Sequence, residues 1–184
     1  PFYSKFIIEV EDNWLMDEVY NVPIDDLIKI LDNSIDKGYT VVWGADVSEK
    51  GFSWRNGVAV VPDKNAPEVA GLERAKWEKM TDAEKDRMLS KFDKPMPEKK
   101  ITQEMRQTEF DNYLTTDDHG MHIVGIAKDQ TGKEYYIVKN SWGDKNDFKG
   151  YLYVTKAYVP YKTTVFLLHK KGIPSDIRQK LHLN

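Results

Sequence analysis

The last third of the chain alternates short hydrophobic segments with turn residues, and this pattern limits the fold more than any other feature of the sequence. Four segments have the length and the β-branched and aromatic content of strands: 119–127, 135–139, 151–154 and 163–169. Polar turns join them, so successive strands are expected to run antiparallel. The series predicts a small, closed or partly closed antiparallel sheet.

Helices are expected beside this sheet. Apolar residues recur at helical spacing after Pro23 and stop before Gly38, which predicts a helix over 22–37 that ends in a C′ glycine. Thr102 is a suitable N-cap for a second helix over 102–113. Further strands are expected at 2–10, 39–43 and 58–61, and a last helix near Pro174. The combination predicts a mixed α+β fold.

Segment 63–100 differs from the rest of the chain. It is charged, contains three prolines and has two helical patches, one at about 68–79 and one after Thr81, where Glu84 completes a capping box. We expect this segment to be a helical surface excursion outside the sheet and not a second domain.

Composition excludes several classes of protein. The chain has 184 residues, of which 40% are hydrophobic, and a net charge of −3 with acids and bases interleaved. No basic stripe indicates nucleic acid, and no apolar run approaches the ~18 residues of a membrane helix. The chain has no cysteine, so disulfides and thiolate metal sites within it are excluded. The scattered methionines indicate no cofactor, and none is predicted.

Two short segments carry residues typical of catalysis: DHG at 118–120, followed by apolar residues, and NSWG at 140–143. One strand, one turn and a second strand separate His119 from Asn140, so adjacent antiparallel strands would bring the two side chains within ~2.7–3.2 Å. The asparagine can then orient one ring nitrogen and leave the other for a nucleophile. Trp142 is placed to cover the pair. A structural role for both residues is the simpler alternative.

In this order and at this spacing the two motifs resemble the histidine and asparagine motifs of papain-like cysteine peptidases. The resemblance is greatest to the aminopeptidase C / bleomycin hydrolase type and covers most of the chain outside 63–100. It implies the C-terminal half of the papain-like fold, an antiparallel β-barrel with flanking helices. It also implies that the strand bearing Trp43 and Ala45 forms a wall of a specificity pocket, although a core position is an equal alternative for Trp43.

The resemblance assigns roles to single residues. His119 resembles the catalytic histidine, Asn140 the orienting asparagine and Trp142 the shielding tryptophan, and Asp118 lies where the family often lines its cleft. The nucleophilic cysteine and the oxyanion glutamine have no match. Because the cysteine of such enzymes precedes the histidine by ~130–150 residues, we expect it upstream of Pro1 and read 1–184 as the C-terminal part of the peptidase domain.

The function implied is a cysteine peptidase, specifically an aminopeptidase that acts on peptides with a free N-terminus. This chain alone is expected to be inactive, since its N-terminal partner half carries the thiol. The first alternative is a papain-like binding module that has lost the cysteine. The second is a zinc hydrolase using His119 and His122, but residues three apart on a strand point to opposite faces, and no metal site is predicted.

Three further expectations follow from the resemblance. The C-terminal residue, Asn184, is a candidate gate whose carboxylate would enter the cleft, with a frayed terminus as the alternative. An apolar face covered by the missing half would favour a homo-oligomer. The family also implies a cytoplasmic location.

Overall fold

The computed structural model describes residues 1–10, 13–66, 74–92 and 94–183. The strands are β1 Lys5–Ile7, β2 Glu18–Tyr20, β3 Val41–Ala45, β4 Phe52–Ser53, β5 Val58–Ala59, β6 His119–Lys128, β7 Glu134–Lys139, β8 Tyr151–Thr155 and β9 Thr163–Leu168. The helices are α1 Ile24–Asp36, α3 Arg74–Glu78, α4 Asp82–Leu89, α5 Gln103–Asp111, α6 Tyr158–Lys162 and α7 Ser175–Lys180, with a 3-10 turn, η1, at Lys170–Gly172.

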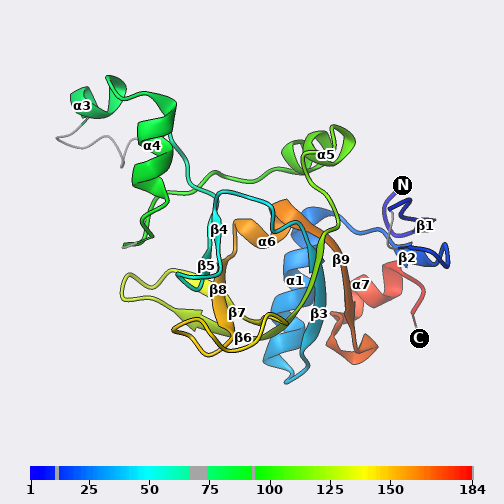
Figure 1. Ribbon diagram of the computed structural model, residues 1–184. Helices are drawn as coiled ribbons and strands as arrows, with labels where there is room; N and C mark the ends of the chain where they lie inside the picture. Colours follow the sequence, from blue (N-terminus) through cyan, green and yellow to red (C-terminus); the bar gives the residue numbers. More distant parts are fainter. Residues whose placement is uncertain (11–12, 67–73, 93, 184) are drawn as a thin grey trace.

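The main sheet has seven strands in the order β4-β5-β8-β7-β6-β3-β9 (Figure 1). Each neighbouring pair is antiparallel except β5 with β8. The long strands β6 and β7 occupy the middle, and β3 lies between β6 and β9. The N-terminal strands β1 and β2 form a separate antiparallel pair.

The expected α+β class and the antiparallel sheet with flanking helices are confirmed. The sheet does not close into a barrel, because among the described residues no pairing joins its two outer strands, β4 and β9. The reason lies in β4 and β5, which have two residues each and form a ladder too short to continue the sheet around to β9.

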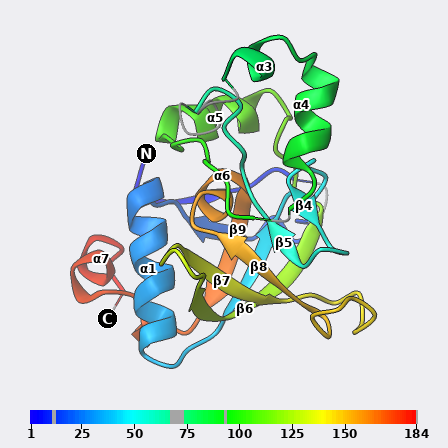
Figure 2. The same ribbon diagram turned by 90° about the vertical axis from the view of Figure 1, so that its left-hand side faces the viewer.

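Helix α1 covers one face of the main sheet (Figure 2). Its apolar stripe places Ile30 and Leu31 at 2% and 0% exposure, and Leu31 packs into the core that contains Trp43 and Tyr136. On the same helix Asp32 accepts a hydrogen bond from the hydroxyl of Tyr136 at 2.7 Å. The helix ends as expected, with Gly38 at φ 77°.

Helices α3 and α4 lie away from the main sheet (Figure 1). The chain enters and leaves this region side by side, since Pro62 and Glu98 form an isolated bridge and Asp63 donates its N–H to the carbonyl of Pro97 at 3.0 Å. Helix α4 contacts the body through Asp86, which pairs with Lys50 at 2.8 Å. Residues 67–73, part of the expected helix over 68–79, lie outside the described residues.

The capping box at Thr81 is confirmed, since its side chain accepts from the N–H of Glu84 and the Glu84 carboxylate accepts from the N–H of Thr81. We expect Thr81→Ala to cost about 1 kcal/mol of local helix stability. Amide exchange over Asp82–Leu89 should therefore become roughly fivefold faster. Ser90→Ala, at the other end of α4, serves as the control. Equal effects of the two substitutions would contradict the capping role.

Some elements differ from the expected ones. The strand expected over 2–10 is reduced to β1, and the one over 58–61 to β5. Helix α6 was not expected, because it has only five residues and contains Pro160. None of the helices within the described ranges has the length and apolar character needed to cross a membrane.

Candidate active site

His119 is the first residue of β6, between β3 and β7. Its backbone pairs with Ala45 at the end of β3. On the other side, β7 ends at Lys139, directly before Asn140. Past this point the chain leaves the sheet, and the N–H of Asn140 donates to the carbonyl of Gly150 at 3.0 Å. Backbone hydrogen bonds therefore fix the positions of the main chain from which both side chains extend.

The side chains of His119 and Asn140 meet at a distance within the expected range, with 2.7 Å between Nε2 and Oδ1. The same Oδ1 accepts the N–H of Ser141 at 2.7 Å, which fixes the amide oxygen toward the ring. An amide oxygen only accepts, so Nε2 of His119 is the donor. In the neutral ring Nδ1 is then the nitrogen that can take up a proton.

Asn140 is buried, with 4% of its surface exposed. Its Nδ2 is also buried and has no hydrogen-bond partner among the described residues. An unpaired buried donor costs stability. An asparagine at this position is therefore not explained by its contribution to stability. It is explained by the hydrogen bond through which it orients His119.

Trp142 lies over the histidine, with 4.6 Å between the two ring centroids. It makes edge contacts with Trp54 at 5.7 Å and Phe52 at 5.9 Å. Trp142 is 46% exposed, so it forms the outer cover of the pair and limits the access of water to the hydrogen bond. Phe52, which the sequence did not single out, reaches this cover from β4, and only its aromatic character next to Gly51 could have indicated it.

Asp118 does not contact the histidine that follows it through any hydrogen bond of its own side chain. Its Oδ1 accepts the N–H of Val47 at 2.9 Å, and Thr116 donates its hydroxyl to Oδ2 at 3.4 Å. Burial and the neighbouring Asp46 raise the pKa of the Asp118 carboxyl. The residue thus ties the start of β6 to the loop after β3.

The second histidine of the strand is separate from the first. Nε2 of His122 lies 2.7 Å from the hydroxyl of Thr40, while His119 pairs with Asn140. Among the described residues, no group of three or more His, Cys, Asp or Glu side chains is placed to hold a metal ion. The geometry therefore gives the zinc hydrolase no support.

Two other predictions concern the C-terminal gate and the wall of a specificity pocket. The chain up to Leu183 folds back on α7 and packs beside Ile30 of α1. Leu183, the last described residue, accordingly lies next to α7, and the gate residue, Asn184, lies outside the described residues (Figure 1). Trp43 and Ala45 are both fully buried. The Trp43 indole donates to the hydroxyl of Thr163 at 2.7 Å, so the core alternative describes it better than a pocket wall.

Comparison with known proteins finds similarity over the part of the chain that carries these motifs. Residues 98–165, which contain His119, Asn140 and Trp142, match the papain family of cysteine proteases. Cathepsin L1 of Drosophila melanogaster is 46% identical over 35 residues, which are 19% of this chain and 9% of that protein. Cysteine proteinase 3 of Dictyostelium discoideum is 46% identical over 39 residues, or 21% of this chain and 11% of that protein.

A solved structure matches over nearly the whole chain. PepW from Lactobacillus rhamnosis superimposes with a TM-score of 0.63 at 17% identity, over 99% of this chain and 35% of that chain. At this identity the likeness concerns the fold. The papain-family match covers the part of the chain that carries both motifs, as the resemblance predicts, and the chain spans about a third of the length of this neighbour.

Proposed function

We propose that this chain supplies the histidine and the asparagine of a cysteine aminopeptidase of the aminopeptidase C / bleomycin hydrolase type. The observation that carries the proposal is the 2.7 Å contact between His119 and Asn140 beneath Trp142. A cysteine on a segment outside this chain completes the site. The free nitrogen of the imidazole, Nδ1, faces that thiol.

In the proposed reaction the thiol is the nucleophile and the imidazole transfers protons. Nδ1 of His119 takes the thiol proton, and the resulting thiolate attacks the carbonyl carbon of the scissile peptide bond. The imidazolium then returns the proton to the leaving amine, which leaves an acyl-enzyme thioester. A water molecule, deprotonated by the same nitrogen, hydrolyses the thioester. Asn140 keeps the ring in the orientation that both transfers need, and Trp142 keeps competing water off the Nε2 hydrogen bond.

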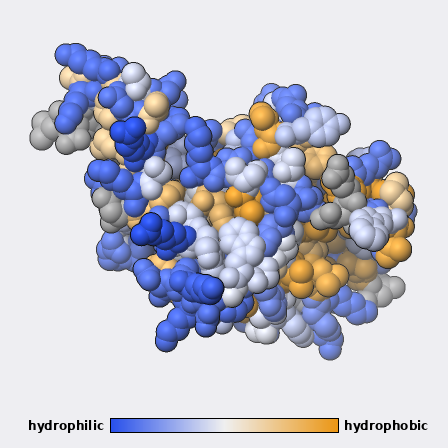
Figure 3. All heavy atoms as spheres, viewed as in Figure 1, coloured by the Kyte–Doolittle hydropathy of each residue, from blue (hydrophilic) through white to orange (hydrophobic). Residues whose placement is uncertain are grey.

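The finer parts of the proposal concern substrate and assembly. The substrates are peptides with a free N-terminus, shortened one residue at a time in the cytoplasm, and Asn184 is retained only as a candidate gate. The N-terminal half and a second copy of the protein are the expected partners. An apolar groove of about 600 Å³ supports this expectation, because Phe6, Phe166 and the 71%-exposed Leu167 line it. Figure 3 shows the apolar surface there, between β9, α7 and the N-terminal strands.

The second candidate function is a papain-like binding module without a cysteine, which the absence of this residue from the chain favours. One experiment separates the two. The full-length gene product is incubated with a peptide that has a free N-terminus and with the same peptide N-acetylated, and the chain alone serves as the inactive control. We expect stepwise release of N-terminal residues from the first peptide only, and inhibition of that release by iodoacetamide.

Three other outcomes would each contradict part of the proposed function. Cleavage of internal bonds in both peptides would retain the cysteine peptidase and refute the aminopeptidase. A folded full-length protein that cleaves neither peptide and has serine or glycine at the nucleophile position would establish the binding module. Turnover by the isolated chain, with contaminating peptidases excluded, would refute the missing-thiol argument.

A further inference from the structure

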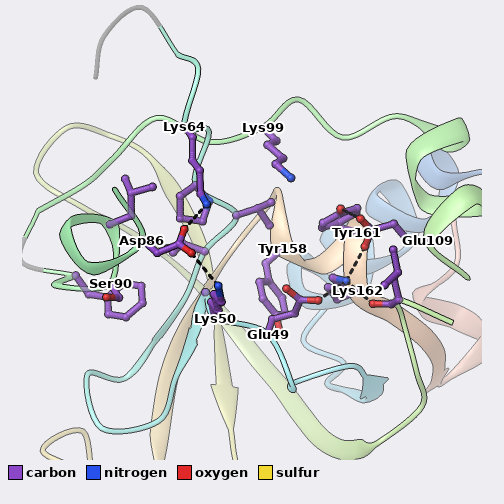
Figure 4. A pocket seen from close by; sticks show the side chains of 17 residues that line it. Glu49, Lys50, Lys64, Asp86, Ser90, Lys99, Glu109, Tyr158, Tyr161 and Lys162 are labelled. Atoms are coloured by element: carbon purple, nitrogen blue, oxygen red, sulfur yellow. Dashed lines mark hydrogen bonds and ion pairs between the residues drawn. The ribbon is translucent and has the colours of Figure 1, made fainter. Parts of the chain in front are cut away.

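A buried lysine outside the proposed catalytic pair lies at the centre of a charged cluster. Lys162, the last residue of α6, is 1% exposed and lines a cavity of about 280 Å³ (Figure 4). Its ammonium lies 2.6 Å from Glu49 and 2.8 Å from Glu109. The carboxylate of Asp46, itself 1% exposed, is 3.9 Å away. A buried ammonium is tolerated only with such partners, so the position is built for a cation.

The partners of Lys162 come from the two segments that adjoin His119. Glu109 and Thr115 belong to the chain that leads into β6, and the hydroxyl of Thr115 lies 3.1 Å from the ammonium. Asp46 and Glu49 belong to the loop that follows β3, whose last residue pairs with His119. The side chain of Lys162 therefore links both chain segments that adjoin His119.

Asp46 connects this cluster to the residues directly before His119. Its Oδ2 accepts the N–H of Thr116 at 3.2 Å, and the hydroxyl of the same threonine donates to Oδ2 of Asp118 at 3.4 Å. Asp118 in turn accepts the N–H of Val47. The connection from Lys162 through Asp46 to Asp118 thus ends one residue before the imidazole.

The residues of this connection are also linked electrostatically. Burial works to lower the pKa of Lys162, but Glu109 and Glu49 raise it, so the ammonium is permanent at neutral pH. Its positive charge lies 3.9 Å from the carboxylate of Asp46. Asp117, adjacent in the chain to Asp118, accepts the hydroxyl of Thr164 at 2.6 Å, and the exposed Asp144 and Lys145 follow Trp142 in the chain.

We propose that Lys162 is a positioning residue that sets the orientation and the proton affinity of His119 through Asp46 and Asp118. The part of the proposal that concerns the imidazole is a property of this chain. The consequence for turnover rests on the proposed function of His119.

The test uses the chain itself and the titration of its imidazoles, followed by NMR, with His119→Ala to identify the resonances. Lys162→Met removes a positive charge, so the titration midpoint of His119 should rise by about half a pH unit, while Asp46→Asn removes a negative charge and should lower it by a similar amount. The ring 15N shifts of His119 should also report a weakened Nε2 hydrogen bond in Lys162→Met. Loss of packing alone would not move the midpoint in opposite directions.

Lys156→Met is the matched control. Lys156 is a partly buried lysine that bridges two carboxylates, Asp32 at 2.8 Å and Glu134 at 2.7 Å. Glu134 is the first residue of β7, whereas Asn140 follows the last residue of that strand. Its replacement should leave the His119 midpoint unchanged. Shifts of the same sign in the two test variants, no shift in either, or an equal shift in the control would overturn the proposal. If Lys162→Met does not fold, the sign of the shift in Asp46→Asn decides.

A second measurement separates this proposal from the proposed function. In the full-length, cysteine-bearing protein, the pH profile of kcat/KM should move in the same direction as the midpoint in each variant. Midpoints that move while the profile does not would refute the catalytic role of His119 and leave the positioning role of Lys162 standing.

Discussion

Replacing His119 with alanine in the full-length, cysteine-bearing protein is expected to lower kcat/KM by about 10⁴-fold or more. In the proposed mechanism the imidazole takes the thiol proton, donates it to the leaving amine and activates water. Without it the thiol stays largely protonated at neutral pH. Initial rates with a free-N-terminus peptide, measured at equal concentrations of folded protein, give the comparison.

Two further variants control this result. His122→Ala removes a histidine of the same strand, whose partner is Thr40, and should leave kcat/KM within about twofold, since surface changes away from the reacting groups have small effects. Asn140→Ala should lower kcat/KM by roughly tenfold to a hundredfold, because a misplaced ring transfers protons less well. An active His119→Ala protein, or equal losses in His119→Ala and His122→Ala, would show that the catalytic histidine has been misassigned.

The largest loss of stability is expected for Trp43→Ala. Trp43 is fully buried at the centre of β3, between β6 and β9, and its indole donates to the hydroxyl of Thr163 at 2.7 Å. Truncation removes an aromatic core side chain, leaves a cavity and removes the donor that the buried hydroxyl of Thr163 accepts from. The expected cost is about 3–5 kcal/mol of the free energy of unfolding, which is much of the stability of a typical domain.

Urea denaturation of the purified chain measures this cost. Trp14→Ala is the matched control, since Trp14 is 87% exposed and its loss should change the free energy of unfolding by less than about 0.5 kcal/mol. The midpoint should fall sharply for the first variant and stay within error for the second. Similar midpoints for the two variants would mean that β3 is not the centre of the core.

Local patterns predicted most of the regular structure. The helical spacing after Pro23, the capping box at Thr81 and the N-cap at Thr102 correspond to α1, α4 and α5. These elements depend on residues within one or two turns of each other, so their signals are complete in the sequence. Helix α6 was missed because Pro160 and its length of five residues give no such signal. Its position depends on the core against which Tyr158 and Val159 are buried.

The candidate site was predictable in part. The order and spacing of the DHG and NSWG segments, together with strand pairing, predicted that His119 and Asn140 would meet. The contacts of Trp142 with Phe52 and Trp54 were not predictable. These two residues lie far from Trp142 in the sequence, and the sheet brings them to it because β5 joins β4 to β8. The open edge of the sheet was not predictable either. Hydrophobic alternation indicates where strands lie, but it does not indicate whether the two outermost strands pair.

By itself the sequence determined most of the strands and helices, the class of fold and the meeting of His119 with Asn140, because each of these is written in short-range patterns or in motifs. Only the tertiary structure decided which charges are buried. Lys162 reads as a surface lysine in the sequence, yet it is 1% exposed, with Glu49 and Glu109 as its partners. Those partners come from distant segments, and a buried ammonium is stable only where the whole fold brings such carboxylates around it.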